Sequence, residues 1–218
     1  MILYGTAYYG KVQQVNKQWI ETKFFHVWFI PLIPVGSMFV TASEFRSRKG
    51  FEVSMHTKSV MAVYLRMFSL LIAAFFIAQL FGFIGDHYYY DETEKHRAVF
   101  INTIEALIAS VVCVYGCFFF GKSGTVDREV REKIGSITGF YALPNWFDYY
   151  HITLLQKQFL SEYNLRFPDS DWKAQLADKQ VDNERIRLLF GVSLFTCMVE
   201  DNPENEQLYY KAYDLYKV

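Results

Sequence analysis

The sequence is poor in cysteine and lacks the short motifs that mark common active sites. Only three cysteines occur in 218 residues, none of them before Cys113, and their spacing matches no zinc site. The chain also has no nucleophile elbow, phosphate-binding glycine loop or HExxH pair. We therefore expect no catalytic, cofactor-binding or metal-binding residues and a non-enzymatic role, although an active site built from scattered residues stays open.

The N-terminus lacks the features of a secretory signal. The segment MILYGTAYYG has no basic residue, and turn-forming residues interrupt its apolar stretch early. We expect no cleavage there, so that the first long apolar segment would act as an internal signal-anchor.

No excess of charge suggests a nucleic acid partner. The net charge is −1. Residues 1–58 hold seven basic against three acidic residues, and residues 122–218 hold twelve against fifteen. The basic N-terminal part could contact anionic lipid headgroups, and no motif for binding nucleic acid occurs.

Two long apolar segments, residues 59–85 and 99–121, dominate the middle of the chain. The first contains an 18-residue run, Met67 to Ile84, without a charge, and the second contains one charge, Glu105, in the 22 residues from Val99 to Phe120. Neither has the polar stripe of a helix in a soluble bundle, and both are long enough to cross a bilayer. We predict a transmembrane hairpin with an outer loop at residues 86–98.

Basic residues flank this hairpin on one side. Residues 44–66 hold five of them and residues 122–133 hold four, whereas the loop at 86–98 has two basic against four acidic residues. Because basic flanks stay in the cytoplasm, both termini should be cytoplasmic. Cysteine use agrees, since none of the three has a plausible partner on an oxidising side.

The segments on either side of the hairpin differ in pattern. Residues 1–58 alternate in hydrophobicity and predict a small cytoplasmic β-domain of four or five strands. Residues 122–218 show helical spacing and predict a cytoplasmic α-helical domain. The expected fold class is thus an α+β membrane protein. Expected helix caps in the last domain are Asp169 or Ser170, Asp182, and Asn202 followed by Pro203.

The stretch from Phe24 to Ile30 is apolar on both faces of the predicted strand. We expect Pro31 and Pro34 to end that strand, because proline cannot donate a ladder hydrogen bond. One face should fill the β-domain while the other meets a second surface, which predicts that Trp28 is buried.

The run FFHVWFIPLIPVGSMFV, Phe24 to Val40, resembles a segment of small uncharacterised bacterial proteins, in which an F-x-H-x-x-F-I-P-L-I-P-x-G pattern occurs in compact β-domains. Some of these are joined to membrane helices and others to a zinc ribbon. The resemblance implies membrane association, and with it the bacterial inner membrane, but no activity. The zinc-ribbon relatives place CxxC pairs around the segment, which this chain lacks, so no metal function carries over. Matching residues are Phe24, His26, Phe29, Ile30, Pro31, Leu32, Ile33, Pro34 and Gly36.

Three polar residues are candidates for a functional site. His26 lies among aromatic residues and is expected to be a structural, hydrogen-bonded histidine rather than a ligand or proton relay. Glu105 lies within a membrane span, where a charge suggests transport or proton handling, or else interface anchoring and helix pairing. Gln79 is expected at a similar depth in the other span, within reach of a hydrogen bond to Glu105.

These features favour a non-enzymatic membrane protein, an adaptor or assembly subunit at the cytoplasmic face. Its expected partners are the lipid bilayer and an unknown protein or a second copy of the chain. The alternative is an oligomeric transport or channel component that uses Glu105 and Gln79, because two spans cannot enclose a pore alone. A membrane-bound enzyme is a third hypothesis, which requires a cytoplasmic pocket with clustered titratable groups.

Overall fold

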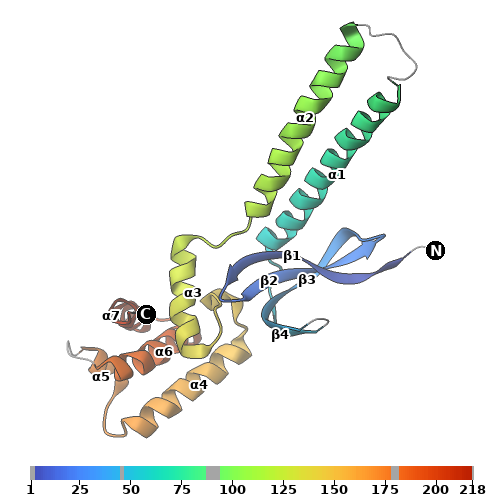
Figure 1. Ribbon diagram of the computed structural model, residues 1–218. Coiled ribbons are helices and arrows are strands. Elements are labelled where there is room, and N and C mark those ends of the chain that lie inside the picture. Colours follow the sequence, from blue (N-terminus) through green and yellow to red (C-terminus); the bar gives the residue numbers. More distant parts are fainter. Residues whose placement is uncertain (1–2, 45–46, 87–93, 178–181, 218) are drawn as a thin grey trace. The chain divides into compact units, whose positions relative to one another are not determined.

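The computed structural model describes residues 3–44, 47–86, 94–177 and 182–217. Its N-terminal part is an antiparallel sheet of four strands in the order β1-β2-β3-β4 (Figure 1). The prediction of a small β-rich region ahead of a helical region is confirmed. The strands are β1 (Tyr4–Val15), β2 (Gln18–Val27), β3 (Ile30–Ser43) and β4 (Arg48–Val53).

Two-residue turns join the first three strands. Asn16 and Lys17 connect β1 to β2 with φ angles of 43° and 63°, and Trp28 and Phe29 connect β2 to β3 with φ angles of 53° and 68°. Positive φ at both central residues is the signature of the type I′ hairpin turn, whose twist matches that of the flanking strands. The prediction of one continuous strand from Phe24 to Ile30 is therefore wrong.

The prediction that Trp28 is buried is also wrong. The side chain of Trp28 is 57% exposed, because the residue occupies the end of a hairpin rather than the middle of a strand. Alternation of apolar residues continues through the turn in the sequence, which concealed the reversal of the chain.

Pro31 and Pro34 lie inside β3 and do not end a strand as predicted. Backbone hydrogen bonds between Glu44 and Ser47, of 2.9 and 3.2 Å, close the β3–β4 hairpin. The antiparallel register then places the end of β4 opposite Met38. Both prolines thus fall where β3 has no strand partner on one edge among the described residues. An edge tolerates a missing N–H, which accounts for only one of the two prolines, because residues three apart in a strand direct their N–H positions to opposite edges.

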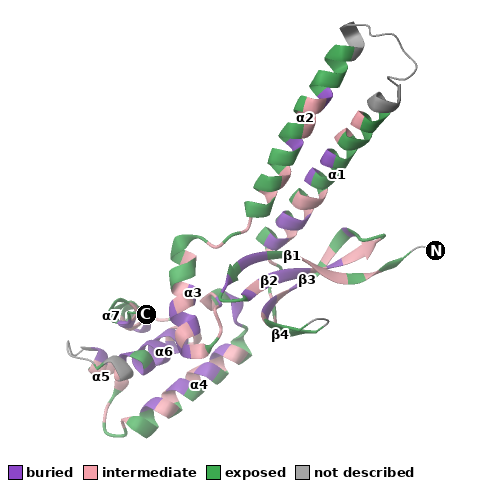
Figure 2. Ribbon diagram, viewed as in Figure 1, coloured by how far each residue is buried: buried purple, intermediate pink, exposed green. Residues whose placement is uncertain are grey.

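Two long helices follow the sheet, α1 (Thr57–Asp86) and α2 (Glu94–Phe119), and pack against each other as a pair (Figure 1). Segments Thr57–Gly82 and Arg97–Phe119 are long and apolar enough to span a membrane. Side chains at the contact are small or polar, whereas most of the remaining surface is apolar and exposed (Figure 2). The predicted outer loop, residues 86–98, falls mostly on residues 87–93, which lie outside the described residues.

The chain forms two compact units. The first comprises Met1–Gln14, Trp19–Met38 and Ser54–Lys122, and the second comprises Val15–Gln18, Phe39–Val53 and Ser123–Val218. Each unit therefore combines part of the sheet with helices. The domain boundaries predicted after residues 58 and 121 stay predictions.

Within the first unit, Arg66 of α1 joins three elements. Its guanidinium donates to the carbonyl oxygens of Cys117 and Phe120, at 3.4 and 3.2 Å, and to that of Lys11 in β1, at 3.3 Å. The carbonyls of Cys117 and Phe120 lie at the C-terminal end of α2, where the helix dipole favours a cation. The Oγ of Ser59 also donates to the carbonyl oxygen of Gly10, at 2.7 Å. The sheet is thereby fixed to one end of the helix pair.

The second unit is built around α6, whose residues from Leu188 to Thr196 are buried, as expected of a core helix. The ring of Phe190 contacts Tyr209 and Tyr213 of α7 and Tyr216 just after that helix, with centroids 5.1–6.2 Å apart. The helical elements of this unit are α3 (Thr125–Thr138), η1 (Pro144–Trp146), α4 (Tyr149–Arg166), α5 (Trp172–Ala177), α6 (Asn183–Val199) and α7 (Pro203–Leu215).

Helix caps in this unit follow the sequence in part. The side chain of Asn202 accepts a hydrogen bond from the N–H of Asn205 with Pro203 at the first helical position, which confirms that prediction. At α5, however, the carboxylate that accepts from the N–H of Lys173 belongs to Asp171, at 3.1 Å, rather than to Asp169 or Ser170.

Candidate functional site

The end of the β2–β3 hairpin carries an unusual number of exposed apolar side chains. Residues 24–43 contain no lysine, arginine, aspartate or glutamate. The N–H of Trp28 donates to the carbonyl oxygen of Leu3 at 2.9 Å, which adds the start of β1 to this surface. Soluble surfaces seldom expose a contiguous apolar patch of this kind. We call it the apolar tip, and its members are Leu3, Trp28, Phe29, Ile30, Leu32 and Ile33.

The backbone of the apolar tip is strained. Bulky side chains avoid positive φ, and a left-handed residue other than glycine costs roughly 1–2 kcal/mol. Trp28 and Phe29 both adopt it, and their side chains, 57% and 70% exposed, gain little burial in return. Backbone strain of this kind clusters at functional segments.

Tyr64 attaches the apolar tip to α1. Its hydroxyl donates a hydrogen bond of 2.7 Å to the carbonyl oxygen of Leu32. The ring of Phe24, fully buried in β2, meets the Tyr64 ring edge-on at 5.7 Å. The hairpin is thus held beside the first turns of α1 by one polar contact and one aromatic contact.

His26 lies half-buried in β2, just behind the apolar tip. Its ring stacks on that of Phe29 with centroids 6.3 Å apart and meets the Tyr9 ring edge-on at 6.2 Å. Its Nδ1 is buried and has no hydrogen-bond partner in the described part of the chain. Among the described residues no group of three His, Cys, Asp or Glu side chains suited to a metal occurs. The contacts that the structure gives His26 are aromatic.

Gln79 and Glu105 are not brought together. Both side chains are exposed on their helices, whereas the α1–α2 contact buries Ser69, Thr103 and Ser110. Within the described residues no hydrogen bond joins Gln79 to Glu105. Glu105 therefore presents a carboxylate on the outer surface of the helix pair instead of inside it.

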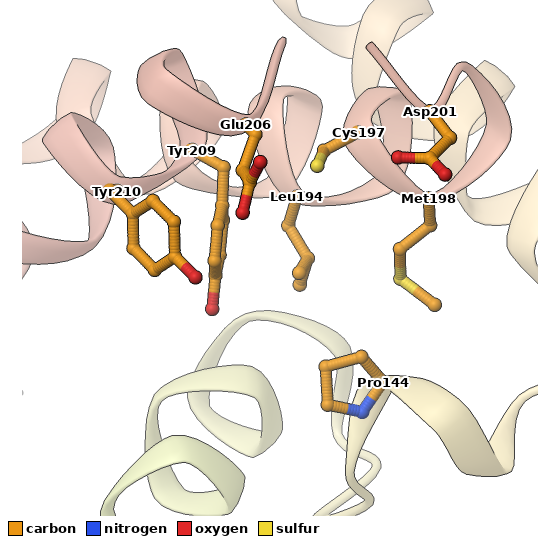
Figure 3. Close-up of a pocket in the computed structure, with 8 residues that line it drawn as sticks. All are labelled: Pro144, Leu194, Cys197, Met198, Asp201, Glu206, Tyr209 and Tyr210. Carbon is orange, nitrogen blue, oxygen red and sulfur yellow. The ribbon is translucent and has the colours of Figure 1, made fainter. Parts of the chain in front are cut away.

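The second unit contains an open pocket of about 260 Å³ between α6, α7 and the segment that begins η1 (Figure 3). Leu194, Met198 and Tyr209 point from the two helices toward Pro144, which forms the opposite wall (Figure 3). Apolar and aromatic groups thus line the pocket, and two exposed carboxylates lie at its rim. The full lining is Pro144, Leu194, Cys197, Met198, Asp201, Glu206, Tyr209 and Tyr210.

Two titratable groups that line this pocket, Cys197 and Tyr209, have raised pKa values. Burial, together with the carboxylates of Glu206 and Asp201, raises the pKa of the Cys197 thiol, which keeps it protonated and poorly nucleophilic. Burial and the neighbouring tyrosines raise the pKa of Tyr209 to about 12, far from the range useful for proton transfer at neutral pH. Both shifts favour the protonated form of the group.

A buried arginine supports the wall that carries Pro144. Arg131 of α3 is fully buried and donates to the carbonyl oxygen of Tyr141 at 2.6 Å and to the Oγ of Ser123 at 2.8 Å. Its guanidinium lies 4.8 Å from the ring of Trp146. Desolvation lowers the pKa of Arg131 to about 10, and the negative charge of Asp127 offsets part of this decrease. The helical spacing of α3 does not indicate that two of its charged residues, Arg131 and Lys133, are buried.

Comparison with known proteins adds no family. No protein-family model, no curated protein and no solved structure matches this chain. The resemblance of residues 24–40 to the uncharacterised bacterial β-domains therefore stays a prediction.

Proposed function

We propose that this protein is an integral membrane protein of the bacterial inner membrane, with α1 and α2 crossing the bilayer and both termini in the cytoplasm. Length and apolar composition support the two spans. The distribution of basic residues supports the orientation, because nine of them flank the hairpin at the end where Arg66 lies. A reporter that works only outside the membrane should be silent when fused after Val218 and active at Tyr89.

Its role on the cytoplasmic side is that of an adaptor that holds a segment of another protein. The α6–α7 pocket is the observation that carries this proposal. The pocket combines an apolar lining with two exposed rim carboxylates, Asp201 and Glu206, and its thiol and phenol have raised pKa values. A ligand that complements it presents an aliphatic or aromatic side chain next to a lysine or arginine.

Photo-crosslinking in native membranes tests the adaptor role. A photoreactive phenylalanine at Tyr210, an exposed wall of the pocket, should capture one protein whose crosslinked peptide carries an apolar residue beside a basic one. Tyr149, 70% exposed on α4 against 57% for Tyr210, lies outside the pocket and is the matched control position. Adding Glu206→Lys should abolish the adduct at 210. Equal capture at both positions, or indifference to Glu206→Lys, would contradict the proposal.

An oligomeric transport component is the second candidate function, and the exposed carboxylate of Glu105 favours it. A charge on the outer surface of a membrane span is costly unless another helix or water covers it. Asn102, one turn earlier on α2, is exposed as well and could share such a contact. A mass measurement in detergent that finds only monomer would count against this candidate. A membrane-bound enzyme stays the third hypothesis.

A further inference from the structure

We propose that the apolar tip of the β2–β3 hairpin is inserted into the cytoplasmic headgroup layer of the membrane, as a third lipid contact beside the two spans. This inference rests on the proposed function in one respect, namely that α1 and α2 cross the bilayer. It adds that the sheet itself is a lipid-binding element, although strands of this kind usually serve only as a scaffold.

The level of the apolar tip relative to α1 supports this placement. The hydrogen bond from Tyr64 to the carbonyl oxygen of Leu32 sets the hairpin beside this residue of α1. Tyr64 lies three residues before Met67, where the uncharged run begins, which is a rise of about 5 Å along a helix. The headgroup layer of one leaflet is roughly 5–8 Å thick. Leu32 therefore lies within that layer when α1 spans the bilayer.

The chemistry of the apolar tip fits this layer. Tryptophan is enriched at membrane interfaces, since its amphipathic ring suits the boundary between headgroups and acyl chains. The tip offers exposed Trp28, Phe29, Ile30 and Ile33, and residues 24–43 contain no charged side chain. A surface of apolar side chains gains free energy by leaving water.

The other hairpin turn of the sheet provides an internal comparison. Asn16 and Lys17 adopt the same pair of positive φ angles and are exposed, but they are the polar residues expected of a turn in water. Two turns of one geometry in one sheet thus differ in chemistry. Only the turn that α1 holds beside the start of its uncharged run is apolar, which favours lipid over a protein partner as its occupant.

Fluorescence quenching in vesicles tests the inference with the full chain. Cys113, Cys117 and Cys197 are replaced by alanine, and single cysteines are introduced by Phe29→Cys, Lys17→Cys and Phe75→Cys. Each variant carries an environment-sensitive fluorophore and is reconstituted in phosphatidylcholine and phosphatidylglycerol vesicles. Two quenchers are then compared, a nitroxide on the lipid acyl chain and iodide in the aqueous phase. Ile33→Cys gives a second position in the tip if Phe29→Cys disturbs the fold.

We expect the label at position 29 to be quenched by nitroxide lipid and shielded from iodide several-fold better than the label at position 17. Accessibility to iodide equal to that at position 17 would overturn the inference. Shielding from both quenchers would also overturn it, because a second copy of the chain would then cover the tip. The label at position 75, exposed midway along α1, separates the two proposals. If nitroxide lipid fails to quench it, the proposed spans are wrong, whereas quenching at 75 without quenching at 29 refutes the tip alone.

Discussion

The hydroxyl of Tyr64 and the carbonyl oxygen of Leu32 form a hydrogen bond of 2.7 Å between the first turns of α1 and the outer part of β3. Leu32 is separated from Tyr64 by 32 residues, so the contact ties the hairpin to the helix rather than to its own neighbours in the chain. It sets the position of the exposed hairpin residues along the axis of α1.

Tyr64→Phe should loosen the hairpin without unfolding the sheet. The change removes one hydrogen bond, worth about 0.5–1.5 kcal/mol, and keeps the ring that meets Phe24. Amide hydrogen exchange of the full chain in detergent should become faster at residues 28–33 and stay unchanged in the second unit. Tyr115→Phe, which alters an exposed phenol on α2, is the control. Identical exchange in the two variants would show that the Tyr64 contact does not hold the tip.

The exposed position of Trp28 predicts a small cost for its removal. A buried tryptophan loses about 3–5 kcal/mol on truncation to alanine, but Trp28→Ala should change the free energy of unfolding by less than about 1 kcal/mol. The pair Trp28→Asn and Phe29→Gly should raise it, because asparagine and glycine accept positive φ. Chemical unfolding in detergent measures both effects. Lys17→Gly relieves the same strain in the other turn and should raise stability similarly.

The stability of the Trp28→Asn/Phe29→Gly variant also separates two explanations of the apolar tip. If the aromatic residues exist for packing within the sheet, the variant should be less stable than the parent. If they serve an external contact, the variant should be at least as stable in detergent, and a label at position 33 should become more accessible to iodide in vesicles.

The sequence predicted those features that depend on a long local pattern. The uncharged run from Met67 to Ile84 is evident from the sequence alone. So is the helix cap formed by Asn202 with Pro203, because both features depend only on residues adjacent in the chain. The turn at Trp28 and Phe29 was missed because neither residue has turn chemistry, and alternation of apolar residues continues across it. The apolar residues of the tip are evident in the sequence, but such residues usually indicate burial rather than an exposed surface.

The pocket and the buried arginine could not be predicted in this way. The pocket combines Pro144 with residues more than forty positions later, and the fold alone brings them together. Arg131 lies in a charged segment, DREVREK, and the sequence pattern does not distinguish it from the charged residues around it. Its burial depends on the carbonyl oxygen of Tyr141, which the helix pattern does not reveal.

Gly191→Ala should destabilise the second unit, although alanine is the better helix former. A Cβ at position 191 would lie 2.5 Å from Cδ1 of Phe159, and that ring is held in place by stacking on Phe195 at 5.6 Å. Overpacking costs about 1–3 kcal/mol, against a gain in helix propensity of about 1 kcal/mol. We expect a lower thermal midpoint for the unit. Gly116→Ala, which meets open space on α2, should show no such loss, and equal behaviour of the two variants would refute the close approach of α4 to α6.

The raised pKa of Tyr209 predicts a specific dependence of stability on alkaline pH. Burial, reinforced by Tyr213, Tyr210 and Cys197, raises the pKa of this phenol from its ordinary value of 10 to about 12. The fold thus favours the neutral phenol. Its contribution to stability is fully present below pH 10 and is lost as pH rises from 10 through about 12.

Tyr209→Phe keeps the ring that stacks on Phe190 and removes the titrating hydroxyl. The difference in thermal midpoint between parent and variant should therefore be constant below pH 10, after which the midpoint of the parent should fall more steeply. Tyr4→Phe, which alters an exposed phenol of β1, should follow the parent throughout. If the parent and Tyr209→Phe curves stay parallel up to pH 12, the phenol of Tyr209 titrates as it would in water, and the pocket is more open than its geometry indicates.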